Sequence, residues 1–348
     1  MNSTSQATAT HRPADRRRRG FTLLELLIAI GVIAILAGIL LPAVFGAKRG
    51  VDQARTVADL KDIESALLAF KDVHGVFPPS SLVLPEDSDL WTTATATSTP
   101  TAAQVQSTLR FLNEVFPQWS PPAATIDLDW NQDGDTSDVV YLNGSECLLF
   151  FLGGGRQSGT VPLGEQVHIG FSKDPTQPFT IGTTNREKPY FEIKSSRLVD
   201  TDFDNMPEYV DQFPDQATPY AYFRAVRDGI YTTAGINGIL GDADDETPPS
   251  GPALVYYKSD IDATPGTPTV DTSSVPTGIP YGNGRFQLIS PGPDGVFGTG
   301  GQYVEDGSPA IASQSIIITN SDASTLTLER DAIDEQDNVA SFTGGGLR

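Results

Sequence analysis

The sequence is poor in the residues that crosslink a fold or bind transition metals. Its one cysteine, Cys147, excludes an internal disulfide, and its three histidines, His11, His74 and His168, stand far apart. A zinc centre built from cysteine and histidine is therefore not expected. Basic residues are also few, 23 against 44 acidic ones, and the resulting formal charge of −21 argues against a nucleic-acid ligand.

The motifs that are missing narrow the function further. The sequence has no glycine-rich phosphate loop, no nucleophile elbow and no zinc motif. Carboxylate pairs abound, but among 44 acidic residues their presence says little about acid–base catalysis. We therefore expect no enzyme and no organic cofactor. Hydrophobic residues still make up 39% of the 348 positions, enough to bury the core of one large or two modest domains.

Long apolar runs are limited to one, which excludes a polytopic membrane protein. Leu26–Ala47 contains no charged residue. At about 1.5 Å per residue this run reaches about 33 Å, enough to cross the hydrocarbon core of a bilayer. Arg16–Arg19 precede it, so the positive-inside rule places the short N-terminus in the cytoplasm and the acidic body on the opposite side.

Composition alone leaves three interpretations of this segment open. A secretory signal peptide would need a shorter apolar run and a better small-residue cleavage site than Ala43–Ala47. A twin-arginine signal rests only on Arg18 and Arg19, within a run of four arginines. A plain membrane anchor explains the length and the flanks but not Glu25, because a charge at the start of an apolar run is costly to bury in lipid.

The sequence around Glu25 resembles a known processing signal. Gly20–Leu27 reads GFTLLELL, after an arginine-rich leader and before the apolar run. This segment resembles the class III signal of type IV prepilins and type II secretion pseudopilins. The resemblance implies that a membrane-embedded prepilin peptidase cuts between Gly20 and Phe21 and methylates Phe21. It also implies that Glu25 and Pro42 are the acidic residue and the helix proline that are common in this family.

Each of these residues has a physical rationale. Gly20 lacks a Cβ, so the backbone before the cut can lie extended in a narrow protease cleft. Glu25 of one subunit can pair with the Phe21 amine of its neighbour, which fixes axial register in a medium of low dielectric, although desolvation offsets much of the gain. Pro42 removes a helix hydrogen bond and predicts a kink or local melting, or else a simple bend at the membrane exit.

Beyond the apolar run the helical pattern continues. Asp59 and the other charged residues of this region fall mostly off one apolar stripe, and Gly75 predicts the end of the helix. The spacing therefore indicates an amphipathic half that packs on a β-sheet. The residues of the stripe are Leu60, Ile63, Leu67 and Phe70.

The resemblance and the patterns together predict an α+β fold. The expected architecture is a pilin-like lollipop, in which one long N-terminal helix packs on an antiparallel β-sheet with long loop insertions. Residues 1–20 form the cleaved leader, 21–47 the transmembrane and assembly half of the helix, and 48–75 its amphipathic half. Residues 76–348 form a periplasmic or extracellular head.

Local patterns in the head predict short elements. Leu109–Phe116 is typical of a short helix. Ser145–Leu152 fits a buried strand or, as we prefer, a capped helix with Cys147 in the core. Thr92–Thr101 and Asp262–Pro280 indicate exposed loops. Strands are predicted at Tyr220–Val226, Leu254–Tyr257, Gly284–Ile289 and Ser315–Thr319.

An acidic loop in the head predicts calcium binding. Oxygen-bearing side chains alternate along it and Gly134 stands at the turn, as in the first half of an EF-hand loop. Val140 occupies the place of the usual final glutamate, so a nearer aspartate must substitute. The alternative is an acidic turn whose side chains cap the backbone. The predicted ligands are Asp129, Asn131, Asp133, Asp135 and Asp138.

Two further acidic stretches are weaker candidates. Ser290–Gly295 reads SPGPDG and resembles the Ser-x-Gly-x-Asp-Gly loop of major pseudopilins. That resemblance implies a structural calcium ion held by Asp294, with Glu305 and Asp306 as weaker ligands. Asp200–Asp204 also offers carboxylates but lacks a turn glycine, and such clusters are more often solvated surface.

The favoured hypothesis is a structural subunit of a type II secretion pseudopilus or a type IV pilus-like filament. Its implied partners are prepilin peptidase, other pilin or pseudopilin subunits and an inner-membrane assembly platform. The subunit would sit in the inner membrane before it enters the filament. The alternative is an adhesin, carbohydrate-binding or enzymatic ectodomain on a pilin-like anchor, which a deep pocket with convergent polar side chains would favour.

Overall fold

The computed structural model describes most of the N-terminal two thirds of the chain and shorter stretches beyond. Contacts within the chain divide it into two compact units, Met1–Gly50 and Val51–Arg348. The described residues are 22–121, 128–157, 162, 165–182, 184–227, 230–231, 256–258, 269–271, 279–280, 285–297, 301–303, 315–319, 325–329, 339–341 and 345–346.

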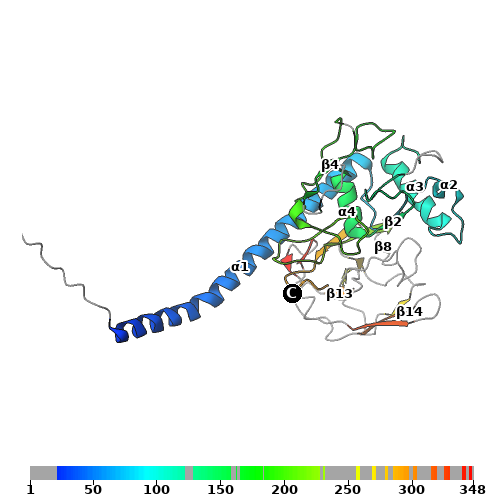
Figure 1. The fold of residues 1–348 in the computed structure, drawn as a ribbon. Coiled ribbons are helices and arrows are strands. Elements are labelled where there is room, and N and C mark those ends of the chain that lie inside the picture. Colours follow the sequence, from blue (N-terminus) through cyan, green and yellow to red (C-terminus); the bar gives the residue numbers. More distant parts are fainter. Residues whose placement is uncertain are drawn as a thin grey trace, which may run out of the picture. The chain divides into compact units, whose positions relative to one another are not determined.

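Helix α1 runs from Leu23 to His74, 52 residues, and contributes to both units (Figure 1). Pro42 lies inside the helix without interrupting it, so the local melting that its ring allows is not seen. The helix ends at Gly75, whose φ of 82° lies in the left-handed region and whose N–H donates to the Lys71 carbonyl at 2.7 Å. The prediction of one long helix ending at Gly75 is confirmed.

Two capped helices follow in the second unit. Helix α3 (Ala102–Val115) begins after Thr101, which forms a capping box with Gln104. It starts earlier than the short helix that the sequence indicated. Helix α4 (Gly144–Gly153) begins after Asn143 in the same way, which confirms a helix rather than a strand there. Shorter helical turns are α2 (Leu90–Thr93) and η2 (Ser195–Arg197).

The largest described sheet has five strands in the order β17-β16-β12-β7-β8, and its pairs are all antiparallel. The central pair joins β7 (Ala221–Arg227) to β12 (Phe286–Ser290), in which all five residues are buried. This sheet and the long helix confirm the predicted α+β fold. The outer strands are β8 (Ile230–Tyr231), β16 (Val339–Ala340) and β17 (Gly345–Gly346).

Smaller sheets complete the described part of the second unit. One of them pairs β1 (Leu82–Pro85) with β2 (Val139–Leu142). Two pairs, β10 with β14 and β9 with β13, are parallel, which the sequence did not indicate. The remaining strands are β3 (Gly155–Arg156), β4 (His168–Gly170), β5 (Leu198–Val199), β6 (Glu208–Tyr209), β9 (Tyr256–Lys258), β10 (Thr269–Asp271), β11 (Ile279–Pro280), β13 (Gly301–Tyr303), β14 (Ser315–Thr319) and β15 (Thr325–Glu329).

The predicted strands correspond to β7, β9, β12 and β14, with shifts of a few residues at most ends. One loop prediction was wrong in part, because Asp262–Pro280 contains β10 and β11. Both are short edge strands rich in threonine, valine or isoleucine, and their pairing partners lie elsewhere in the chain. The local composition of a segment rich in proline and threonine does not indicate pairing with distant strands.

The amphipathic half of α1 forms one wall of the core of the second unit. Its predicted stripe, Leu60 to Phe70, is at most 2% exposed. The stripe joins one cluster with side chains from α3, α4, β7 and β12. Phe70 packs edge-on against Phe151 of α4, with ring centroids 5.8 Å apart. The stripe therefore packs on helices as well as on a sheet, whereas the sequence pattern indicated a sheet alone.

Candidate functional site

The first turn of α1 holds the described part of the predicted processing signal. The Glu25 carboxylate accepts hydrogen bonds from the Thr22 backbone N–H and hydroxyl, both at 3.0 Å, and the Glu25 N–H donates to the Thr22 hydroxyl at 3.2 Å. These reciprocal bonds form a capping box that satisfies free amides at the helix start. Gly20 and Phe21 lie outside the described residues.

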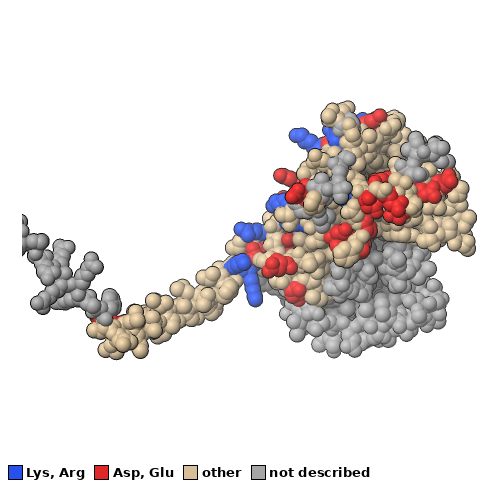
Figure 2. Space-filling view, viewed as in Figure 1, with Lys and Arg blue, Asp and Glu red and all other residues tan. Residues whose placement is uncertain are grey.

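The apolar half of α1 has no protein covering in the single chain. Its most hydrophobic window has a mean hydropathy of 2.8 and no buried residue, so the helix is long and apolar enough to cross a membrane. In Figure 2 this stretch is tan, and blue basic residues follow it. Lys48 and Arg49 are the first charged residues after Glu25. A surface this apolar needs a lipid or protein environment.

The loop predicted to bind calcium adopts successive Asx turns. Asn131 Oδ1 accepts from the Asp133 N–H at 3.1 Å, and Asp133 Oδ1 accepts from the Asp135 N–H at 2.7 Å. Asp135 Oδ1 accepts from the Ser137 N–H at 2.9 Å. These side chains cap the backbone, as in the alternative interpretation of the loop. Calcium binding here stays a prediction.

The same loop contacts the second acidic stretch, a juxtaposition that the sequence did not reveal. Asn131 Nδ2 donates to the Asp204 carbonyl at 3.0 Å, and Asn205 Nδ2 donates to the Asn131 carbonyl at 2.6 Å. Arg156 bridges the two stretches by donating to the Asn131 and Asn205 carbonyls at 2.7 and 2.9 Å. These neutral acceptors leave the guanidinium charge unpaired by any described carboxylate, and burial lowers its pKa.

Glu86 is a buried acid whose carboxylate accepts a hydrogen bond from the backbone of this loop. Its Oε1 accepts the Trp130 N–H at 2.6 Å, and its Oε2 has no hydrogen-bond partner among the described residues. Burial raises the pKa of Glu86 to about 7, and the nearby Asp129 and Asp133 charges add to that rise. The sequence gave no signal for this role, because Glu86 simply follows a short strand.

The remaining predicted ligands are less enclosed. Asp138 is half-buried, and its backbone carbonyl accepts the Glu86 N–H at 3.0 Å. Asp294 is exposed, and its Oδ1 accepts the Val296 N–H at 2.9 Å, which closes a turn after β12. Glu305 and Asp306 lie outside the described residues. The described part of the Asp294 loop therefore offers a single carboxylate.

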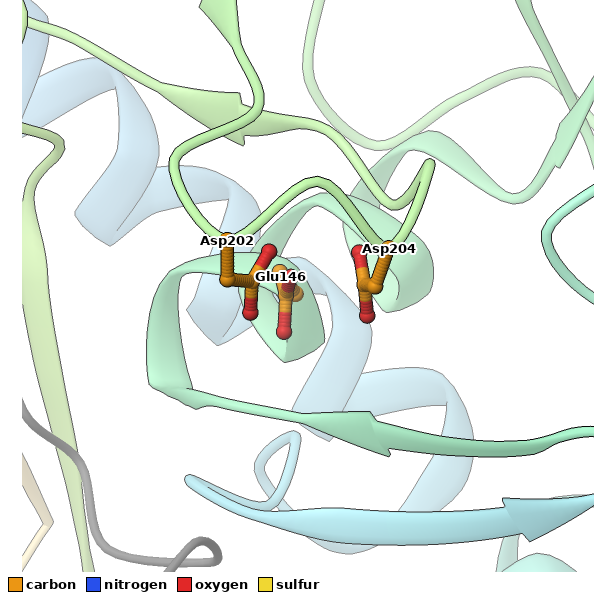
Figure 3. Close-up of side chains that lie close together, drawn as sticks. All are labelled: Glu146, Asp202 and Asp204. Atoms are coloured by element: carbon orange, nitrogen blue, oxygen red, sulfur yellow. The ribbon is translucent and has the colours of Figure 1, made fainter.

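A different set of acids converges in the described part of the head. Glu146, Asp202 and Asp204 each place one carboxylate oxygen within 4.8 Å of the others (Figure 3). Glu146 is the capping-box residue of α4, whereas Asp202 and Asp204 belong to the loop between β5 and β6. The sequence indicates that loop only as a weak candidate and gives no sign of a ligand at Glu146. The Asn143-to-Glu146 spacing announces a helix cap rather than a site.

A family comparison bears on the first turn of α1. The prokaryotic N-terminal methylation motif matches residues 15–41, which include the end of the leader, the Gly20–Phe21 junction and Glu25. The N-terminal segment is similar to that of type IV pilins and pseudopilins. The predicted resemblance is thereby confirmed for the part of this pilin-like chain that carries the processing signal.

Curated relatives are similar over more than sixty residues, a longer stretch than the motif. Type II secretion system core protein G of Dickeya chrysanthemi is 36% identical over 64 residues, 18% of this chain and 42% of that protein. The protein of the same name from Vibrio cholerae serotype O1 is 36% identical over 63 residues, 18% of this chain and 43% of that protein. The protein of that name from Escherichia coli K12 is 38% identical over 68 residues, which are 20% of this chain and 47% of that protein.

The pilin-like chain thus spans less than half the length of these curated relatives. At least four fifths of the chain lies outside each similarity. No solved structure matches the chain significantly. The relatives therefore inform the N-terminal helix, and the chemistry of the head has to be argued from its own residues.

Proposed function

We propose that this pilin-like chain is a structural subunit of a type II secretion pseudopilus or of a related type IV pilus-like filament. The observation that carries the proposal is the methylation motif over residues 15–41, at the start of a helix of 52 residues whose first half is apolar. Similarity to type II secretion core protein G from several bacteria supports secretion as the setting. The proposed role is structural rather than enzymatic.

The precursor crosses the inner membrane once. The arginines of the leader hold the N-terminus in the cytoplasm, and the acidic head lies on the periplasmic or extracellular side. Prepilin peptidase cuts between Gly20 and Phe21 and methylates Phe21. The cut removes the basic leader, which otherwise anchors the helix to the cytoplasmic face of the membrane.

Glu25 directs assembly once Phe21 is free. In the single chain the Glu25 carboxylate bonds the amide and hydroxyl of Thr22, next to the new terminus. In a filament the same carboxylate pairs with the Phe21 amine of a neighbouring subunit, while the exposed apolar side chains of α1 pack on one another. The inner-membrane assembly platform and the other subunits are the partners in this step.

We also propose that calcium binds the head, as the sequence of the Asp129–Asp138 loop and Asp294 indicates. The oxygen-only donor set of that loop suits a hard cation. Asp133 and Asp135 each use Oδ1 to accept a backbone N–H. A carboxylate has about four lone-pair sites, so both side chains can still offer an oxygen to an ion. Asp135→Asn removes one carboxylate of this set and tests its contribution.

Co-expression of the full chain with a prepilin peptidase tests the processing step. Mass spectrometry of the mature protein should identify N-methyl-Phe21 as the first residue, and Gly20→Val should retain the leader. A wild-type protein that keeps its leader beside an active peptidase contradicts the proposal.

Assembly is tested separately in cells that make the complete machine. Glu25→Val should be cut normally but should fail to enter sedimentable filaments, because its neighbour's amine loses its partner. Asp62→Val is the matched control, since Asp62 is an exposed acid on the same helix. Normal filaments from Glu25→Val would refute the pairing, and a loss from both variants would show a nonspecific effect.

A further inference from the structure

The acidic cluster of Glu146, Asp202 and Asp204 shares no carboxylate with the loop in which the sequence predicts calcium, although Asn131 of that loop contacts the Asp204 backbone. Glu146 comes from the first turn of α4, and the two aspartates come from a loop more than fifty residues later. Figure 3 shows the three carboxylates pointing toward one another. One oxygen of each residue lies within 4.8 Å of the others.

One member of the cluster carries a buried oxygen without a partner. Glu146 is 1% exposed. Its Oε2 accepts the Asn143 N–H at 2.7 Å in the capping box, but its Oε1 has no hydrogen-bond donor among the described residues. Helix capping therefore accounts for one oxygen and leaves the other unexplained. A buried anionic oxygen is stable only when a donor or a cation meets it.

The charges around the cluster are almost all negative. Asp200 and Glu208 lie on the same segment, and the Asp202 and Asp204 charges raise the pKa of Glu146 beyond the effect of burial. The Arg156 charge interacts with Asp204, yet the guanidinium donates its hydrogen bonds to neutral groups, among them backbone carbonyls and the Gln166 side chain. No described lysine, arginine or histidine forms an ion pair with the three carboxylates.

We propose that Glu146, Asp202 and Asp204 bind one calcium ion. Calcium takes carboxylate oxygens at about 2.4 Å, so two oxygens on opposite sides of one ion lie about 4.8 Å apart. The three carboxylates meet that limit without a change of backbone. Water and backbone carbonyls complete the six to eight oxygens that calcium prefers. Asp202 is exposed, which gives the ion an entry from solvent.

Calcium at this site would join three parts of the head. It would tie the start of α4 to the loop between β5 and β6 through Glu146 and Asp204. The Asp204 carbonyl in turn accepts from Asn131, so the Asp129–Asp138 loop would be held by the same ion at one remove. The proposal does not rest on filament assembly, because it concerns the stability of the head in the single chain.

A shared proton is the competing explanation. Asp202 and Asp204 interact through a side-chain hydrogen bond when one of them is protonated, and burial raises the pKa of both. A proton-sharing pair would make the protein insensitive to calcium and more stable as the pH falls. If the cluster binds calcium, the stability of the protein at neutral pH should instead depend clearly on the calcium concentration.

The test uses the purified full chain in detergent at pH 7.5, with calcium chloride or with EDTA. Calcium should raise the melting temperature of the wild type, and calorimetry should show a binding event. Asp202→Asn should weaken calcium binding at the cluster at least tenfold and remove the part of the rise that this site contributes. In EDTA the same variant should melt no lower than the wild type, because it removes a like charge from the cluster.

Two further variants locate the ion. Glu146→Gln keeps the side-chain oxygen that caps α4 but loses the charge, and it should lose the same part of the calcium response as Asp202→Asn. Asp135→Asn alters the sequence-predicted loop alone, so it should lose at most the part of the response that the loop contributes and keep the part that depends on the cluster. The proposal fails if calcium leaves the wild-type melt unchanged, or if Asp202→Asn and Glu146→Gln respond as the wild type does. It also fails if Asp135→Asn alone removes the response, since the ion would then lie in the other loop.

Discussion

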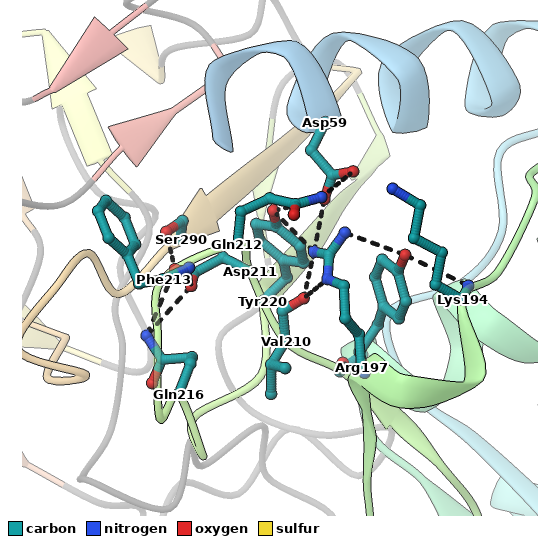
Figure 4. Close-up of polar contacts among 12 residues, drawn as sticks. Asp59, Lys194, Arg197, Val210, Asp211, Gln212, Phe213, Gln216, Tyr220 and Ser290 are labelled. Carbon is teal, nitrogen blue, oxygen red and sulfur yellow. Dashed lines mark hydrogen bonds and ion pairs between the residues drawn. The ribbon is translucent and has the colours of Figure 1, made fainter. Parts of the chain in front are cut away.

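Arg197 donates a hydrogen bond to Asp59 across 2.5 Å, and both side chains are buried (Figure 4). Asp59 lies on α1 and Arg197 ends η2, 138 residues later in the chain. The Tyr220 hydroxyl donates to the same Asp59 oxygen at 2.8 Å, and Arg197 Nε donates to the Val210 carbonyl at 2.8 Å. The guanidinium also lies 4.1 Å from the centre of the Tyr209 ring.

This network fixes the amphipathic half of α1 in the second unit. A shift of α1 along its axis would separate Asp59 from Arg197 and Tyr220. Buried charges with incomplete partners are strongly destabilising, so a slip of the helix is disfavoured. The network therefore adds specificity to the hydrophobic contacts.

Loss of one partner of this pair should be costly. Asp59→Ala leaves the Arg197 charge buried without its carboxylate, and the free energy of unfolding should fall by about 3–5 kcal/mol. Asp62→Ala, an exposed acid on the same helix, should change it by less than about 0.5 kcal/mol. Urea denaturation of the full chain in detergent measures both. A small effect of Asp59→Ala would show that the pair contributes little.

The stripe itself can be tested at Phe70. Its side chain is 0% exposed and contacts the rings of Phe151 and Tyr190. Phe70→Ala should lower the free energy of unfolding by about 3–5 kcal/mol, because it removes apolar contact and leaves a cavity. Leu68→Ala, on the exposed face at 41% exposure, is the control and should cost much less. Equal losses from the two variants would contradict the assignment of the buried face.

Gly170 should not tolerate a side chain. Its φ is 75°, and an added Cβ would lie 2.0 Å from the Glu187 carbonyl oxygen, an atom of the backbone that cannot turn aside. Left-handed backbone strain alone costs an alanine about 1–2 kcal/mol. Gly170→Ala should lower the free energy of unfolding by more than that, because the clash adds to the strain. Gly182→Ala meets no atom within 4 Å and should be nearly neutral. Thermal melts of the two variants compare the positions directly.

His168 should make the head acid-sensitive. Burial, with a smaller effect of the Arg156 charge, lowers the pKa of His168 to about 3. Below pH 6.5 His168 therefore binds a proton in the unfolded chain but stays neutral in the folded chain. This stability is fully present above pH 6.5 and is lost as the pH falls, by up to about 2 kcal/mol at pH 5.

Urea titrations of the wild type and His168→Gln between pH 7.5 and 5 isolate this effect. Burial raises the pKa values of Glu86 and Glu146, so their protonation stabilises the folded state as the pH falls over the same range. This effect is the same in both proteins. The variant should lose less stability on acidification than the wild type. Parallel pH profiles would show that His168 is protonated in the folded state as easily as in the unfolded one.

Local chemistry made much of α1 predictable from the sequence. The uncharged run after Glu25, the helical spacing from Leu60 to Phe70 and the terminating Gly75 each act within a few residues of one another. The α4 helix was predictable for the same reason, because Asn143 and Glu146 cap it across three residues. Strands β7 and β14 were visible as short runs of β-branched and aromatic residues.

The pattern failed where polar residues occupy buried positions. Asp52, Thr56 and Asp59 are buried on α1. The sequence pattern instead predicted that the charged residues of this region lie mostly off the buried stripe. Their burial depends on partners that the helix does not contain, and for Asp59 the partner is Arg197. A helical periodicity that counts only apolar residues cannot identify a buried ion pair.

The sequence by itself determined that the chain has a methylation motif, an apolar helical segment and an amphipathic continuation, because these depend on neighbours along the chain. Only the tertiary structure decided which acids meet. Glu146 reaches Asp202 and Asp204 because α4 and the β5–β6 loop pack together, and Asn131 reaches Asp204 through the same contact. Oxygen ligands converge through space, and the fold rather than the spacing sets that distance.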